Sequence, residues 1–166
     1  MRIGLVRSAW LLAAVGCALL AGCPKGSSGP TLYKVTGKVV RDGIPIPIPN
    51  HREGYKCLEV EFFALDDAGA LKPSPGGRAF VKQDGSFTIV GEAAKGLRAG
   101  KYRVAVRNIN MLIPTGTGRK SSDPTGRPDE WAGKFDQNKS PFVFDITGSQ
   151  GDIVIDVAKP PAAPSK

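Results

Sequence analysis

The chain has few of the residues that build metal sites and disulfide frameworks. Its 166 residues include one histidine and three cysteines, and aromatic residues make up 7%. Hydrolytic zinc needs about three protein ligands, so the single His51 excludes a metallopeptidase, and we expect no metal and no cofactor. No apolar run reaches the roughly 20 residues that a membrane-spanning helix needs. The composition therefore favours a protein that is not an enzyme.

The first 22 residues have the organisation of a secretory signal peptide. Arg2 and Arg7 give a positively charged start, and an apolar stretch follows from Ser8 to Leu20. We expect residues 1–22 to be removed, which leaves a mature chain without a transmembrane helix.

The motif Leu20-Ala21-Gly22-Cys23 ends this signal and resembles the lipobox of bacterial lipoproteins. The resemblance implies that Cys23 carries acyl chains such as palmitate and becomes the new N-terminus. Two acyl chains give stable anchoring, because each buried CH₂ contributes about 0.8 kcal/mol. One alternative is an ordinary small-x-small cleavage site with the cut directly before Pro24, and proline is a poor residue to cut before. The other is Ala14-Val15-Gly16-Cys17, which lies inside the apolar run and lacks the leucine.

We expect the protein to be located in the cell envelope. In lipoproteins, a residue other than Asp after the lipidated cysteine implies the outer membrane, facing the periplasm or the cell surface, and here that residue is Pro24. The net charge is +8, and loss of Arg2 and Arg7 leaves 21 minus 15, or +6. This charge favours the membrane and an envelope protein or polysaccharide as partners. Nucleic acid is excluded, because no motif interleaves aromatic and basic residues.

Alternating apolar residues predict an all-β chain with one solvated sheet face. The expected strands lie near residues 32–40, 58–64, 78–82, 87–90, 101–107, 142–146 and 153–157. The turn at Asp84-Gly85 predicts that 78–82 and 87–90 form an antiparallel pair. The residues expected on the solvated face are Glu59, Glu61, Lys101, Arg103, Ala105 and Arg107.

Four regions follow from this pattern. They are a signal peptide (1–22), a lipidated cysteine with a flexible tether (23–31), a β-sandwich (32–157) and a disordered Pro/Ala tail (158–166), and an irregular loop spans 108–141. The Ile/Pro stretch 44–49 either covers a sheet edge or presents isoleucines to a partner. Cys57 is expected to be a shielded apolar residue, the alternative being a reactive thiol.

Three motifs resemble the carboxypeptidase regulatory-like domain, which is transthyretin-like (prealbumin-like). They are Val35-Thr36-Gly37-Lys38-Val39, residues 82–89 (KQDGSFTI) and residues 97–104 (LRAGKYRV). Residues 131–135 (WAGKF), with Lys139-Ser140-Pro141, are similar to the end of small bacterial lipoproteins that carry this domain. The resemblance implies a seven-stranded antiparallel β-sandwich with a binding or structural role, although the Ile/Pro insertion departs from the family pattern.

The candidate contact residues lie in the long loop. Trp131 and Phe135 could form a platform for a carbohydrate, with Lys134 and Arg127 selecting acidic polymers. The alternatives are contact with a protein partner, or packing of both rings onto the sandwich. Catalysis by a carboxylate pair, Asp66 with Asp67 or Asp129 with Glu130, is disfavoured because these residues lie in polar turns.

Overall fold

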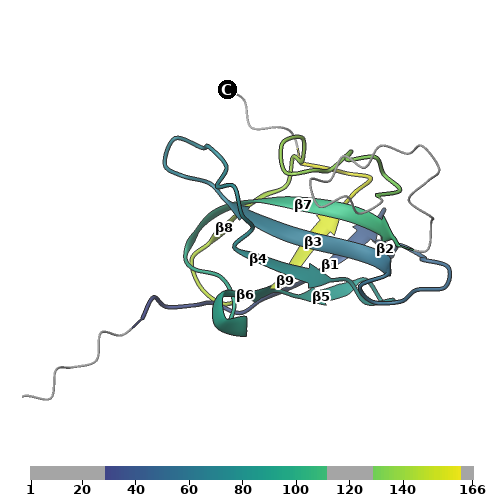
Figure 1. Ribbon diagram of the computed structural model, residues 1–166, viewed down its shortest axis with the longest axis horizontal. Coiled ribbons are helices and arrows are strands. Elements are labelled where there is room, and N and C mark those ends of the chain that lie inside the picture. The colour runs from purple at the N-terminus through teal and green to yellow at the C-terminus, as the bar shows by residue number, and fades with distance from the viewer. Residues whose placement is uncertain (1–28, 112–128, 162–166) are drawn as a thin grey trace, which may run out of the picture.

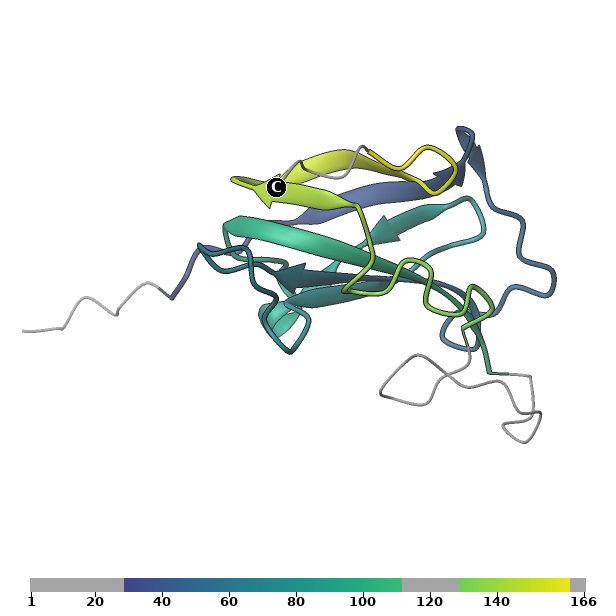
Figure 2. The ribbon, with the colours of Figure 1, turned by 90° about the horizontal axis from the view of Figure 1, so that it is seen from above.

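The alternating apolar residues fold into two β-sheets that lie face to face as layers (Figures 1 and 2). The structure is a computed structural model that describes residues 29–111 and 129–161. These residues form nine strands, of which β2 and β6 have two residues each. The predicted all-β sandwich architecture is thus confirmed. The 3₁₀ turn η1 (Glu92–Ala94) is the one helical element in the described ranges.

The first sheet is built around β1 (Val35–Arg41). This strand pairs antiparallel with β2 (Ile44–Pro45) and β5 (Ser86–Thr88), and parallel with β9 (Gln150–Asp156). The parallel pair shows that a wholly antiparallel sandwich was a wrong expectation. It arises because the chain crosses from the other sheet before β9, and parallel neighbours require such a crossover.

β1 and β9 approach each other so closely that Gly37 has no room for a side chain. A Cβ at this position would collide with the carbonyl oxygen of Ile153 and lie 2.7 Å from the Phe87 ring. The pairing register also shifts between Val35 and Gly37. Gly37 is therefore required by packing between the strands, since its φ is not in the left-handed region.

The second sheet has five strands in the order β6-β4-β3-β7-β8, and every neighbouring pair is antiparallel. Their bounds are β3 Lys56–Ala64, β4 Gly77–Phe80, β6 Val90–Gly91, β7 Gly100–Asn110 and β8 Val143–Ile146. β7 continues through residues 108–110, so the irregular loop predicted from 108 begins only after Asn110. The long register with β3 extends β7, because Leu58 pairs with Asn108 and Lys56 with Asn110.

The Asp84-Gly85 turn joins the two sheets. Two backbone hydrogen bonds close it: Lys82 N–H donates to the Ser86 carbonyl at 2.8 Å, and Gly85 N–H donates to the Lys82 carbonyl at 2.9 Å. Beyond this turn β4 pairs with β3 and β6, whereas β5 pairs with β1. The predicted antiparallel pair is therefore wrong. The two strands supply apolar residues to one core from opposite layers, so the turn must cross between them.

The core lies between the sheets, as the alternation predicted. Its buried members include Val35, Val39, Leu58, Val60, Phe62, Phe87, Tyr102, Val104, Val106, Ile146, Ile153 and Ile155. The Ile/Pro stretch adds to this core, since Ile46 is buried and Ile48 packs against it, whereas Ile44 is 68% exposed. Two of its three isoleucines therefore pack onto the core, and Ile44–Pro45 pairs with the end of β1 as the strand β2.

The other face of β3 and β7 is largely buried, which contradicts the predicted solvated face. Glu59 is 0% exposed, and Glu61, Ala105 and Arg107 are also buried. The prediction is confirmed at Lys101, which is exposed, and Arg103 is partly buried. Arg107 Nη1 lies 3.1 Å from Glu61 Oε2, so a buried guanidinium faces a buried carboxylate. Alternation predicted correctly which side these residues point to. It carries no information on whether that side is covered.

Cys57, also on this face, is fully buried, and Gly54 N–H lies 3.3 Å from its sulfur. The prediction of a shielded residue is confirmed. The expected signal peptide and Cys23 lie outside the described residues, as do residues 162–166 of the expected tail. Within the described part of that tail, Lys159 Nζ lies 3.2 Å from Asp42.

Candidate functional site

The predicted contact residues lie in a series of turns along the edge of β7: these are Trp131, Lys134 and Phe135. The fourth, Arg127, lies outside the described residues. Three isolated backbone hydrogen bonds attach this segment, which we call the edge segment (129–142). Val104 N–H donates to the Phe142 carbonyl, Val106 N–H to the Phe135 carbonyl and Glu130 N–H to the Asn108 carbonyl, at 2.8 to 3.0 Å. The edge segment continues the line of β8 along β7 and covers an edge that would otherwise be open.

The aromatic residues of the edge segment pack into the sandwich. Phe135 is 5% exposed and belongs to the core, and Trp131 is partly buried against it. The two rings meet edge to face, with centroids 5.6 Å apart, and the Phe142 ring also packs against Phe135, with centroids 5.7 Å apart. Packing of both rings onto the sandwich, one of the predicted alternatives, is what the structure shows. Phe135 thus has no free face on which a sugar could stack.

The carboxylates of Asp129 and Glu130 are used to hold the edge segment. Asp129 accepts hydrogen bonds from the backbone N–H groups of Asn108, Trp131 and Gly133 at 2.9 to 3.0 Å. Glu130 accepts from the side-chain amides of Asn108 and Asn110, at 3.1 and 2.6 Å. These contacts favour a structural role for the pair over general acid catalysis.

The remaining candidates for proton chemistry have similar roles. Asp66 closes the turn after β3 by accepting from the N–H groups of Ala68 and Ala70. His51 Nε2 donates to the Val81 carbonyl at 2.9 Å, which ties the loop before β3 to the end of β4. No group of three or more His, Cys, Asp or Glu in the described ranges could hold a metal ion.

A hollow that the sequence reasoning missed lies at the opposite end of the sandwich. It has a volume of about 270 Å³ and lies between the end of β3, the loop before β4, η1 and the start of β7. Its charged lining residues are Lys72, Glu92, Arg98 and Lys101, and Tyr102 and Ser74 contribute hydroxyl groups. From the sequence, residues 97–104 (LRAGKYRV) indicate a family motif and Lys101 a solvated sheet face, and neither pattern predicts a binding site here.

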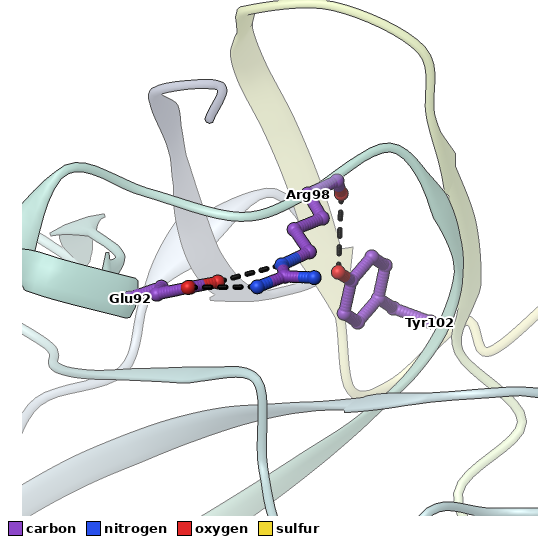
Figure 3. A network of polar contacts seen from close by, with 3 residues as sticks. All are labelled: Glu92, Arg98 and Tyr102. Atoms are coloured by element: carbon purple, nitrogen blue, oxygen red, sulfur yellow. Dashed lines mark hydrogen bonds and ion pairs between the residues drawn. The ribbon is translucent and has the colours of Figure 1, made fainter. Parts of the chain in front are cut away.

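Figure 3 shows the polar network at this hollow. Arg98 Nε and Nη2 donate to the two carboxylate oxygens of Glu92, at 2.6 and 2.7 Å. The Tyr102 hydroxyl donates to the Arg98 carbonyl at 3.1 Å. The hydrogen bonds from Arg98 lower the pKa of Glu92, and the same contact raises the pKa of Arg98. Burial raises the pKa of the Tyr102 hydroxyl above its ordinary value.

Two charged groups at the hollow lack an ionic partner. Neither Lys72 nor Lys101 forms an ion pair with the residues that the structure describes, and both are exposed. Arg98 keeps its third guanidinium nitrogen, Nη1, outside the bidentate contact with Glu92. In Figure 3 this nitrogen lies on the side of the Tyr102 ring. The hollow thus combines available cationic donors with a buried aromatic floor.

Comparison with known proteins gave no match to a family model, to a curated protein or to a solved structure. Within the described residues, no helix has the length and apolar character needed to cross a membrane.

Proposed function

We propose that this chain is a lipid-anchored lipoprotein of the bacterial envelope, placed at the outer membrane, with a non-catalytic protein-interaction or structural role. The observation that carries the proposal is the motif Leu20-Ala21-Gly22-Cys23, which follows a positively charged start and a short apolar stretch. The transthyretin-like identity of the sandwich is part of the same proposal and rests on the motifs in 35–39, 82–89 and 97–104.

The direction of the chain supports a display role. Tyr33 pairs with Leu97 through two backbone hydrogen bonds of 2.7 and 3.0 Å, so the chain enters the sandwich at the end that holds the hollow. β1 then runs to the far end, as Figure 2 shows. A tether from Cys23 to Tyr33 spans at most roughly 35 Å when fully extended. In an anchored protein the tether would therefore join the sandwich at the end with the hollow, and the far end would lie farthest along the domain from the tether.

That far end carries exposed apolar side chains. Ile44 follows β1 and is 68% exposed, Tyr55 precedes β3 and is 49% exposed, and Met111 follows β7 and is 44% exposed. Met111 N–H donates to the Tyr55 carbonyl, and the Arg52 guanidinium lies 4.4 Å from the Tyr55 ring centre. Tyr, Met and Arg are enriched at protein interfaces, which favours a protein partner at this end.

The non-catalytic part of the proposal is supported by the positions of the reactive groups. The carboxylates of Asp129 and Glu130 hold the edge segment, and His51 holds a loop. These three candidate groups thus have hydrogen-bonding roles within the fold.

The experiment that tests the anchor replaces Cys23 in the full-length chain expressed in a bacterial host. We expect Cys23→Ala to abolish incorporation of labelled palmitate and to prevent the protein from sedimenting with outer-membrane fractions. Cys17→Ala and Cys57→Ala are matched controls, because neither cysteine is expected to carry lipid. Labelling or membrane sedimentation that survives Cys23→Ala would contradict the proposal.

A further inference from the structure

We propose that the hollow at the Tyr33 end binds a phosphate-bearing anion, held by Lys72, Arg98 and Lys101. This site is separate from the lipid anchor, and the proposal does not depend on that anchor. The proposal rests on the charge of the lining residues, the orientation of the donors and the shape of the hollow.

The residues that line the hollow carry more positive than negative charge. Three cationic residues (Lys72, Arg98 and Lys101) and one acidic residue (Glu92) line the hollow. Arg98 is paired with Glu92, whereas Lys72 and Lys101 find no ionic partner within the described ranges. A group with two negative charges, such as a phosphate monoester, would complement the two unpaired ammonium groups.

The contact with Glu92 sets the orientation of the Arg98 guanidinium. The bidentate contact with Glu92 restrains the guanidinium plane, with Nε and Nη2 directed toward the carboxylate. Nη1 is left as a donor on the side of Tyr102 (Figure 3). A restrained guanidinium loses less conformational freedom when it binds an anion than a free one would. The Ser74 hydroxyl lines the same hollow and offers a further neutral donor.

The shape of the hollow depends on small residues and one buried ring. Tyr102 is 4% exposed, and a Cβ built on Gly76 would lie 3.1 Å from its Cε1 atom. Gly100, which also lines the hollow, has a φ of +144°. These positions keep the space beside the tyrosine ring open. A volume of about 270 Å³ accommodates a phosphate group with a few attached carbon atoms.

The test measures binding of inorganic phosphate and glycerol 3-phosphate to the mature chain 23–166 by isothermal titration calorimetry and by amide chemical shifts. We expect saturable binding, with the largest shifts in residues 96–101. The double variant Lys72→Gln/Lys101→Gln should weaken binding about tenfold or more, since two charge-assisted contacts are lost. The matched control Lys38→Gln/Lys82→Gln removes the same charge from exposed lysines outside the hollow and should leave binding unchanged.

Absence of saturable binding in the unmodified chain would overturn the proposal. An equal loss in the control variant would also overturn it, because net charge alone would then explain the binding. A second part of the experiment tests whether the bound phosphate belongs to a lipid. This part rests on the proposed lipid anchor. If phosphatidylglycerol vesicles compete with glycerol 3-phosphate for the hollow, the site takes a phospholipid headgroup, and if they do not compete, it takes a free phosphate ester. The free-phosphate arm succeeds or fails independently of Cys23.

Discussion

The edge segment and the residues around the hollow, 92–102, are both connections at the margin of the sandwich, yet their side chains serve different purposes. In the edge segment, Phe135 enters the core and both Asp129 and Glu130 are bound to groups of the fold. Around the hollow, Glu92 and Arg98 pair with each other while about half exposed. An irregular stretch with aromatic residues can therefore serve to pack against the fold. A short glycine-rich turn can leave hydrogen-bond donors available for a ligand.

The most severe test of this comparison removes the core side chain of the edge segment. We expect Phe135→Ala to lower the free energy of unfolding by about 3 to 5 kcal/mol, because the ring is 5% exposed and its loss leaves a cavity. Urea denaturation measures the change. Lys134→Ala is the matched control: Lys134 is exposed, its Nζ lies 5.0 Å from the Phe135 ring centre, and its loss should cost about 1 kcal/mol or less. Equal effects of the two variants would contradict a structural role for Phe135.

A smaller effect is expected at the polar attachment of the edge segment. Glu130→Ala should lower the free energy of unfolding by about 1 to 3 kcal/mol, because the buried amides of Asn108 and Asn110 lose the acceptor shown in the structure. Glu130→Gln keeps one acceptor oxygen and should fall between this variant and the unmodified chain. Thermal unfolding compares them. The exposed Glu53, which forms no side-chain hydrogen bond or ion pair with the described part of the chain, provides a control, and its replacement by alanine should change stability by about 0.5 kcal/mol or less.

The strands could be predicted where apolar residues alternate along the sequence. The inward sets of β3 and β7 follow from alternation, because a strand places every second side chain on one face. Whether the second face is covered depends on residues far away in sequence. For this reason Glu61 and Arg107, which look like ordinary solvated residues in their strands, turned out to be a buried pair.

The candidate sites were less predictable for a related reason. The edge segment has no periodicity, since it contacts β7 through isolated hydrogen bonds and not through a ladder, so its path could not be read from the sequence. The turn at Asp84-Gly85 was located correctly, but a turn signal does not say whether the strands on either side share a sheet. The hollow needs three connections to meet at one end, and only the three-dimensional arrangement brings Lys72 beside Arg98 and Lys101.

The smallest expected effect is a change in the pKa of Glu92, at the hollow. Hydrogen bonds from Arg98 lower the pKa of Glu92 in the folded chain, so Arg98→Gln should raise it toward its ordinary value. Because the folded pKa is the lower one, ionised Glu92 contributes stability at pH values above its ordinary pKa, and this contribution is lost as the pH falls through the lowered pKa. The acid limb of the stability curve should therefore be shallower in Arg98→Gln.

A pH titration of the Glu92 carboxyl carbon by NMR measures this shift, with Asp84 as the internal control. The pKa of Asp84 is lowered by hydrogen bonds from Ser86, which do not involve Arg98, so it should be the same in both chains. An unchanged pKa of Glu92 in Arg98→Gln would mean that the guanidinium is not held by this carboxylate. The orientation of Nη1 at the hollow would then lose its physical basis. The edge segment, whose contacts are independent of Arg98, would keep its role.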